Sequence, residues 1–199
     1  ADDVADALSD LAPFDAVGHR VVHGGAAFRA PVVVDHGVRQ RLDELTALAP
    51  LHQPKSLAGL DAVMAMAPDV PSVACFDTAF HATLPPEAST YAVPADWREH
   101  LGVRRYGFHG LSHAYASRRA MAMAAEEDAP ASRVVTCHLG AGASLTAVLD
   151  GRSVDTTMGF TPLEGLTMAT RSGSVDPGAV LWLLTHQGMT ADEVTDALE

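Results

Sequence analysis

The sequence of 199 residues predicts an α/β protein, and three observations support this fold class. Short apolar runs at residues 14–22, 32–34 and 73–76 are rich in β-branched side chains and predict strands. Between these runs, apolar side chains recur at helical spacing over residues 38–48 and again over 57–67. Residues 133–151 have the pattern of a strand, a glycine loop, a second strand and a tight turn.

The first strand carries one unexpected residue. Residues 4–11 are typical of the tail of a helix, and the strand over 14–22 then leads into His23-Gly24-Gly25. Arg20 interrupts the apolar run, and burial of a guanidinium group is costly without a partner. We therefore expect Arg20 either to meet a carboxylate or phosphate, or to occupy a surface position on a half-buried strand.

Two helices and a third strand follow. Pro50 is expected to end the helix over residues 38–48, and the apolar stripe of the next helix is typical of core packing. His52 lies in the loop between them, a position typical of a capping or surface histidine. Asp77 follows the buried strand over residues 73–76. Its carboxylate is suitably placed for chemistry at a strand end, and equally for capping a helix.

The middle of the chain is irregular. Prolines at 85, 86 and 94 leave room for a short strand over 91–93, and we place a lobe boundary or hinge near residues 78–90. Residues 103–113 then combine two arginines, two histidines, two glycines and an aromatic pair, which is too irregular for a core element. A helix rich in alanine and methionine is expected over residues 114–125.

Residues 133–151 are the stretch around which the chain is organised. The small-residue loop 140–144 separates two apolar runs, and Asp150-Gly151 predicts a hairpin turn that requires positive φ. Glycines allow backbone N–H groups to approach a phosphate closely, so the loop is a candidate anion cradle. A plain hairpin loop explains the same glycines. The spacing of a Walker or dinucleotide-binding loop, which a helix would follow, is absent from this sequence.

Local signals also define the C-terminal part of the chain. Two loops over residues 159–165 and 168–173 precede a helix that Asp176 caps and that Pro177 begins. Gly188 ends that helix, and Thr190 with Glu193 forms a capping box for a last one. The second loop contains a single arginine, Arg171.

Composition limits the classes of partner. The net charge of −12 disfavours nucleic acids and anionic membranes, and no apolar run is long enough to span a bilayer. The two cysteines, at positions 75 and 137, lie in strand-like runs and are expected to be buried, reduced thiols. With no secretory signal visible at the N-terminus, we expect a cytoplasmic protein, built as one domain or as two incomplete lobes.

Five candidate functional residues form a set suited to phosphoryl transfer: Arg20, Asp77, His109, His138 and Arg171. A transferring phosphoryl group needs fixed cations and N–H donors, and a carboxylate can position Mg²⁺ or the acceptor. We find no convincing nucleophile, and no third ligand accompanies His109 and His113 at a spacing useful for zinc.

The sequence resembles the acetate kinases, members of the acetate and sugar kinase, Hsp70 and actin superfamily. Seven motifs in order carry the resemblance: GHRVVHGG (18–25), APLH (49–52), FDTAFH (76–81), RRYGFHG (104–110), HLG (138–140), TRSG (170–173) and DPG (176–178). The resemblance implies an actin-like, ribonuclease H-like kinase fold. Residues 1–80 would be the end of the first lobe, and residues 81–199 the start of the second.

The resemblance also implies a reaction and a role for each candidate residue. The reaction is the reversible, Mg²⁺-dependent transfer of phosphate between ATP and acetate, giving acetyl phosphate and ADP, in a homodimeric enzyme. Arg20 and Arg171 would bind the phosphoryl group, His109 would donate a hydrogen bond to it, and Asp77 would act near Mg²⁺, with no metal ligand set of its own in the chain. The implied acyl pocket comprises Val22, Leu51, Phe108 and Pro162, and the implied nucleotide loop comprises His138, Leu139, Gly140, Ala141 and Gly142.

Two departures from the family pattern bear on activity. Ala141 stands where the family usually has an asparagine, which removes a donor beside the nucleotide phosphates. The chain also corresponds to about the middle half of such an enzyme, without its first phosphate loop, its adenosine site and its metal-binding glutamate. We therefore expect the isolated chain to have little kinase activity. The alternatives are a non-catalytic fragment with a structural or dimerisation role, and a propionate- or butyrate-type kinase.

Overall fold

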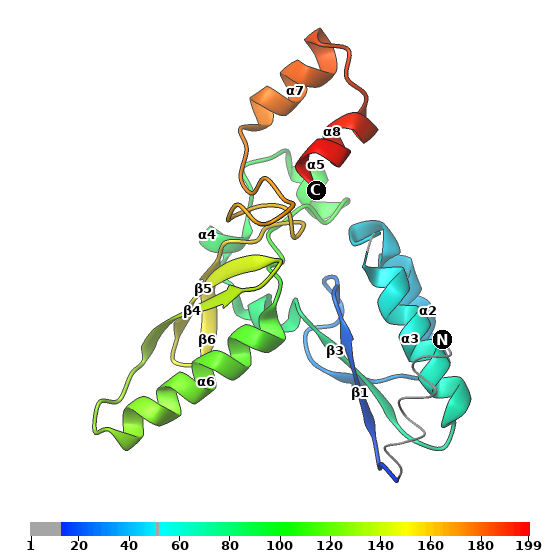
Figure 1. Cartoon of the computed structure of the whole chain (residues 1–199), viewed down its shortest axis with the longest axis vertical. Helices are drawn as coiled ribbons and strands as arrows, with labels where there is room; N and C mark the ends of the chain where they lie inside the picture. Colours follow the sequence, from blue (N-terminus) through cyan, green and yellow to red (C-terminus); the bar gives the residue numbers. More distant parts are fainter. Residues whose placement is uncertain (1–12, 51) are drawn as a thin grey trace.

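The computed structural model describes residues 13–50 and 52–199, so the helix predicted over residues 4–11 lies outside the described residues. Figure 1 shows two groups of elements that meet near the middle of the molecule. One group contains a sheet with helices α2 and α3, and the other contains a hairpin sheet with helix α6. Helices α7 and α8 extend away from both groups.

The first group occupies residues 17–76. Its elements are β1 (Val17–Val21), β2 (Val32–Val33), α2 (His36–Glu44), η1 (Leu45–Leu48), α3 (Gln53–Met66) and β3 (Ser72–Phe76). The strand order is β1-β3-β2, with β1 parallel and β2 antiparallel to β3. An apolar cluster between the sheet and the two helices forms the core: Val21, Phe28, Val34, Leu42, Leu57, Leu60, Ala74 and Phe76.

Two boundaries in this group differ from the prediction. Strand β1 is shorter than the predicted run over 14–22, and it is half-buried, with Arg20 on its exposed face. The single helix predicted over 38–48 is wrong, because α2 ends at Glu44 and a 3₁₀ turn continues to Leu48. The residue before a proline is driven out of the α region, and Ala49, before Pro50, has φ −149° and ψ 63°.

The connecting region contains short helical turns: η2 (Ala79–Thr83), α4 (Pro86–Ser89) and α5 (Ala95–Glu99). The strand predicted over residues 91–93 is wrong. The Val93 N–H bonds to the Tyr91 carbonyl in a tight turn, and the Tyr91 hydroxyl is drawn away to Glu164 and the Phe160 N–H. Element η2 packs against both β3 and β6, while the division of the chain at residue 80 stays a prediction.

The second group confirms the strand, glycine loop, strand and turn pattern. It comprises α6 (Gly110–Glu126), β4 (Arg133–Leu139), β5 (Ala143–Leu149) and β6 (Arg152–Thr156), in the antiparallel order β4-β5-β6. Asp150 and Gly151 form the predicted turn, with φ of 49° and 77°. Helix α6 covers one face of the sheet (Figure 1), and the buried positions of that face are largely polar.

Two further predictions for this group need correction. Helix α6 begins at Gly110, four residues before the predicted start, because a backbone hydrogen bond from another element fixes its first turn. Both cysteines are free thiols as predicted, but Cys137 is exposed and Cys75 is only partly buried. Cys137 alternates with the buried Thr136 along β4, so its side chain faces away from α6.

The last two helices begin where local chemistry predicts. Asp176 accepts the Gly178 N–H at the start of α7 (Pro177–His186), and Thr190 with Glu193 forms the capping box of α8 (Ala191–Leu198). Gly188, with φ 69°, follows the end of α7. Among the described residues, no helix is both long and apolar enough to cross a lipid bilayer.

Candidate active site

Arg20 and Asp77 form an ion pair that links β1 to the end of β3. The Arg20 Nη2 lies 2.6 Å from Asp77 Oδ2, and Nε donates to both carboxylate oxygens at 3.1 and 3.2 Å. The Arg20 side chain is 60% exposed and that of Asp77 is 2% exposed. The prediction that Arg20 meets a carboxylate is therefore confirmed. The alternative prediction, a surface position for Arg20, also holds, because its side chain remains largely exposed to solvent.

The backbone of Asp77 positions the next candidate residue. Its carbonyl accepts the Gly110 N–H at 2.8 Å, and a Cβ at Gly110 would lie 2.1 Å from that oxygen, so only glycine fits. This contact fixes the start of α6 directly after His109, which has a left-handed backbone with φ 57°. A positive φ is uncommon for a residue with a side chain, and such geometry concentrates at functional sites. The strand end that carries Asp77 therefore also places His109.

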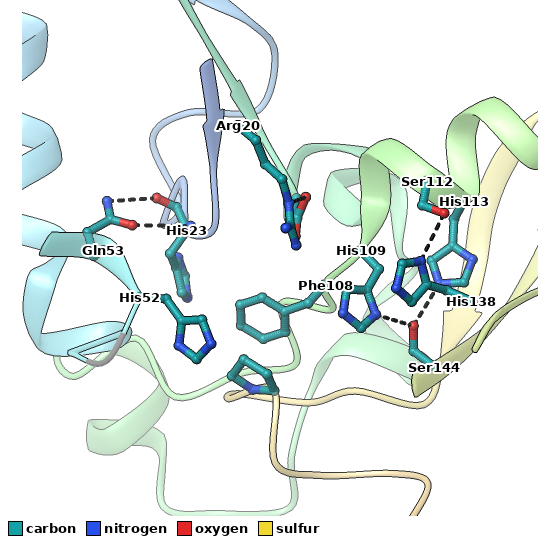
Figure 2. A network of polar contacts seen from close by, with 12 residues as sticks. Arg20, His23, His52, Gln53, Phe108, His109, Ser112, His113, His138 and Ser144 are labelled. Atoms are coloured by element: carbon teal, nitrogen blue, oxygen red, sulfur yellow. Dashed lines mark hydrogen bonds and ion pairs between the residues drawn. The ribbon is translucent and has the colours of Figure 1, made fainter. Parts of the chain in front are cut away.

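His109 is a buried, neutral imidazole beside two arginines. Its ring stacks on that of His138 with centroids 3.9 Å apart, and its Nδ1 lies 2.9 Å from the Ser144 hydroxyl (Figure 2). Burial, followed by repulsion from His138, Arg20, His113 and Arg171, lowers the pKa of His109 to about 3. At neutral pH the ring therefore acts through hydrogen bonds and carries no charge.

The glycine loop between β4 and β5 closes against His109. A Cβ at Gly142 would lie 3.2 Å from the His109 ring and 3.5 Å from the Arg171 guanidinium group. The Gly140 N–H is not free for a ligand, because it donates to the Gly142 carbonyl at 3.0 Å. The amides of Ala141 and Gly142 have no intramolecular partner in the part of the chain that the structure describes. Of the loop amides, only those of Ala141 and Gly142 are therefore available to a ligand. The loop also places Gly142 in the candidate site.

Arg171 borders the same space, because a Cβ at Gly142 would lie 3.5 Å from its Nη1. Within the described part of the chain its guanidinium group makes only long contacts, to the Pro162 carbonyl at 3.4 Å, to His52 Nε2 at 3.5 Å and to Met168 Sδ at 3.9 Å. No carboxylate lies within 4.0 Å of it among residues 13–50 and 52–199. A half-buried cation without a counter-ion is well placed to bind an anionic ligand.

A cavity of about 100 Å³ adjoins Arg171. Pro162 lines this cavity, together with Ala49 and His52, whereas Val22 and Phe108 pack with Ala49 in the buried cluster behind it. Three of the four predicted acyl-pocket residues thus lie in or directly behind one small cavity. The fourth, Leu51, lies outside the described residues.

Sequence reasoning missed several residues of this site. His52 occupies the N-cap position of α3, as expected, without a side-chain cap bond, but it also lines the cavity and contacts Arg171, which the sequence did not predict. His113 and Ser144 connect to His109 through hydrogen bonds, and Ser112 bonds to His138 at 3.0 Å. The available signal was the spacing of four residues between His109 and His113 at the start of a helix.

Not every polar residue singled out in the sequence belongs to the site. Arg105 donates to the carbonyls of residues 88, 156, 157 and 158 and forms an ion pair with Glu164 at 2.9 Å. It therefore braces the loops behind the cavity. His23 is likewise structural, because Gln53 bonds to both its N–H and its carbonyl.

Asp77, which pairs with Arg20 and whose carbonyl holds the start of α6, is a carboxylate that could contribute to a Mg²⁺ site. Among the described residues, no group of three or more His, Cys, Asp or Glu side chains is arranged to hold a metal ion. Mg²⁺ usually binds through one or two carboxylates with waters and substrate phosphates, so a complete protein cage is not required. The Asp77 side chain is 2% exposed and both of its oxygens accept from Arg20, so in such a role it would share these oxygens between Arg20 and the ion.

Comparison with known proteins identifies the family. The sequence profile described as the Acetokinase family matches residues 3–199. The chain belongs to the acetokinase family. It is 50% identical over 193 residues to the acetate kinase of Thermosipho africanus, and 49% identical over 191 residues to that of Thermotoga maritima. These matches cover 97% and 96% of this chain, respectively, and 47% of each relative, so the chain spans about half their length.

Solved structures of acetokinase relatives have the same fold. A propionate kinase from Francisella tularensis matches with a TM-score of 0.89 at 40% identity, covering 99% of this chain and 50% of that one. The acetate kinase of Porphyromonas gingivalis matches with a TM-score of 0.84 at 42% identity, covering 93% and 46%. The actin-like fold implied by the resemblance is therefore confirmed for the part of the fold that the chain spans.

The buried histidines of this acetokinase chain predict a loss of stability in acid. Burial lowers the pKa of His23, His81 and His113 to about 4, and that of His109 to about 3. The unfolded chain takes up these protons near pH 6.5, so the free energy of unfolding should fall as the pH decreases from 6.5 towards 4. Each histidine contributes at most about 1.4 kcal/mol per pH unit.

Urea denaturation between pH 7.5 and 4.5 measures the dependence of stability on pH. NMR titration of the histidine ring protons shows which histidines cause it. The four buried rings should remain neutral where unfolded histidines titrate. A flat stability profile below pH 6.5, or native midpoints near 6.5 for these rings, would contradict the prediction.

Proposed function

We propose that the protein containing this chain is a carboxylate kinase that transfers phosphate reversibly between ATP and acetate, giving acetyl phosphate and ADP. The observation that carries this proposal is the convergence of Arg171, His109 and Gly142 on one space beside the Arg20–Asp77 pair. Membership of the acetokinase family supports it. Because the chain spans about half of its relatives, the complete activity is a proposal for the longer protein.

The proposed acceptor is a short carboxylate. Arg171 would hold its charged end, and the small cavity with Pro162 at its wall and Phe108 behind it would receive the methyl group. A cavity of about 100 Å³ favours a short acyl chain. The similarity to a propionate kinase makes propionate and butyrate the alternatives that an assay must compare.

In the proposed mechanism, the phosphoryl group passes in line between two oxygens, and the protein stabilises the charge that spreads over its equatorial oxygens. Arg20 and Arg171 would supply positive charge, and neutral His109 would donate a hydrogen bond. The loop from His138 to Gly142 would hold the nucleotide phosphates through its free amides. Mg²⁺ bound near Asp77 would neutralise phosphate charge.

We further propose that the protein is a homodimer and works in the cytoplasm. Large apolar side chains are exposed on β4 and α7, including Leu139 at 73% and Leu181 at 60%, and such surfaces are commonly covered by a partner. The two free cysteines are compatible with a reducing compartment. Light scattering during gel filtration would measure the oligomeric state. A monomeric extended chain would contradict the proposed homodimer.

Acyl phosphate formation from ATP and Mg²⁺ tests the proposed activity. The assay should compare acetate, propionate and butyrate, using the 199-residue chain and an extended chain. The extended chain carries, at both ends, the corresponding segments of an acetate kinase relative. We expect activity in the extended chain, with acetate as the best acceptor, and little activity in the chain alone. An extended chain that folds but phosphorylates none of the three acids would overturn the proposed function.

The nucleotide loop gives a sharper test of the register. Ala141 is exposed at the loop tip, so Ala141→Asn in the extended chain should leave turnover unchanged or improve it modestly. One added neutral hydrogen bond is worth about 0.5 to 1.5 kcal/mol. Gly142→Ala is the contrasting variant, because its Cβ would crowd His109 and Arg171, and it should lower turnover. Steady-state kinetics compare the two, and a large loss in Ala141→Asn would show that the assignment of the loop is wrong.

A further inference from the structure

Buried polar side chains of α6 and the sheet beneath it form one hydrogen-bonded chain that ends at His109. The Thr136 hydroxyl lies 2.8 Å from His113 Nδ1, and His113 Nε2 lies 2.8 Å from the Ser144 hydroxyl. The same hydroxyl lies 2.9 Å from His109 Nδ1 (Figure 2). The four residues are between 0% and 9% exposed, so they satisfy one another.

Counting protons shows that the two histidines are coupled. The Ser144 hydroxyl is 0% exposed and, among the described residues, has no partner besides the two rings, so its one hydrogen must be donated to one ring and its oxygen accepts from the other. If it donates to His109 Nδ1, then His113 Nε2 donates to it, and Thr136 donates to His113 Nδ1. In the reverse arrangement each bond changes direction, and Thr136 donates to the Thr146 carbonyl at 3.5 Å. Neutral His109 and His113 therefore carry the same tautomer, either Nε2–H or Nδ1–H.

The surroundings of His109 Nε2, the ring nitrogen that does not contact Ser144, determine which of the two arrangements is more stable. This nitrogen lies beside Gly142, at the space that Arg171 also borders. Without a ligand, nearby positive charge favours a lone pair on Nε2. An anion in the same space accepts hydrogen bonds and favours Nε2–H. Burial keeps the pKa of His113 at about 4, so at neutral pH this ring also responds by changing tautomer.

We propose that Ser144, His113 and Thr136 are positioning residues that convert His109 into a neutral Nε2–H donor when a phosphate-type anion binds. This proposal rests on the proposed function. It adds three buried residues to the site, and we call the hydrogen-bonded chain of Ser144, His113 and Thr136 the relay. Each imidazole carries one ring proton in both arrangements, so the net charge of the site does not change. The change of tautomer takes up one proton from water at His109 Nε2 and releases one to water from the Thr136 end of the chain. The neutral donor would stabilise the phosphoryl group without adding a third cation beside Arg20 and Arg171.

A second buried serine–histidine pair, between β6 and η2, provides a matched control. His81 Nδ1 lies 2.9 Å from the Ser153 hydroxyl, and its Nε2 lies 2.9 Å from the Phe108 carbonyl. A carbonyl can only accept, so neutral His81 is fixed as the Nε2–H tautomer. Ser153→Ala therefore removes a buried serine–histidine bond and leaves every hydrogen bond of the relay in place.

The test is NMR of the ring nitrogens in the ¹⁵N-histidine-labelled chain at pH 7.5, with and without inorganic phosphate. We expect His109 and His113 to show the same tautomer, and phosphate to move both towards Nε2–H. In Ser144→Ala the response of His113 should disappear, whereas in Ser153→Ala it should persist. Backbone spectra would report the folding of each variant.

Opposite tautomers for His109 and His113 in the unmodified chain would overturn the proposal, even if a variant failed to fold. It would also be overturned if phosphate left the two rings unchanged as Nδ1–H, or if His113 responded equally in Ser144→Ala. These results are independent of the kinase assay. Absence of phosphoryl transfer would overturn the proposed function while leaving coupled tautomers in place, and uncoupled tautomers could occur in an active kinase.

Discussion

Replacing Arg171 with alanine in the extended chain is expected to lower kcat by about 100-fold to 1,000-fold. The guanidinium group has no carboxylate partner among the described residues, so its charge is available to a ligand. Charge on the transferring group is greatest in the transition state, and a preorganised cation therefore affects kcat more than the KM for acetate. Steady-state kinetics with acetate and ATP measure both constants.

Arg171→Lys is the matched variant, and it should not restore turnover. Lysine keeps the charge but lacks the planar fork that can contact two phosphate oxygens together. Circular dichroism would check that both variants fold. If folded Arg171→Ala kept near-normal turnover, Arg171 would instead be a structural residue that holds Pro162 and His52 at the cavity.

Chemistry between neighbours in the sequence explains the successful predictions. The Asp176 cap, the Thr190–Glu193 capping box and the Asp150-Gly151 turn each depend on residues within four positions. The partner class of Arg20 was also predictable, because an unusual charge in a strand must meet an opposite charge or water.

Contacts between distant segments explain the failures. The start of α6 depends on the Asp77 carbonyl, which lies 33 positions before Gly110 and leaves no local signal. The relay from His113 to Ser144 depends on the packing of α6 over β5, and a sequence shows neither residue as part of a site. Cys137 was expected to be buried because its strand is apolar, but no described element covers that face of β4 at this position.

The Arg20–Asp77 pair leads to the second large expected effect, a coupling between two variants. Arg20→Ala leaves a carboxylate that is 2% exposed without its partner, which should cost about 1 to 3 kcal/mol of stability. Asp77→Asn should cost less, because the Arg20 side chain is 60% exposed and water can solvate it. Both variants should lower kcat strongly, since one removes a cation from the phosphoryl site and the other removes the carboxylate proposed to act near Mg²⁺.

A double-mutant cycle shows whether Arg20 and Asp77 act together as an ion pair or contribute to turnover independently. Two residues in contact typically couple by about 0.5 to 3 kcal/mol, so the double variant should lose less activity than the two single variants together predict. Urea denaturation and steady-state kinetics of the extended chain measure the coupling in stability and in kcat. Arg39→Ala with Asp61→Asn is the control cycle, because that ion pair lies on the surface of α2 and α3, with the two side chains 24% and 50% exposed. Additive losses of kcat in the Arg20–Asp77 cycle would show that the two residues act separately, and that their ion pair does not position either group for phosphoryl transfer.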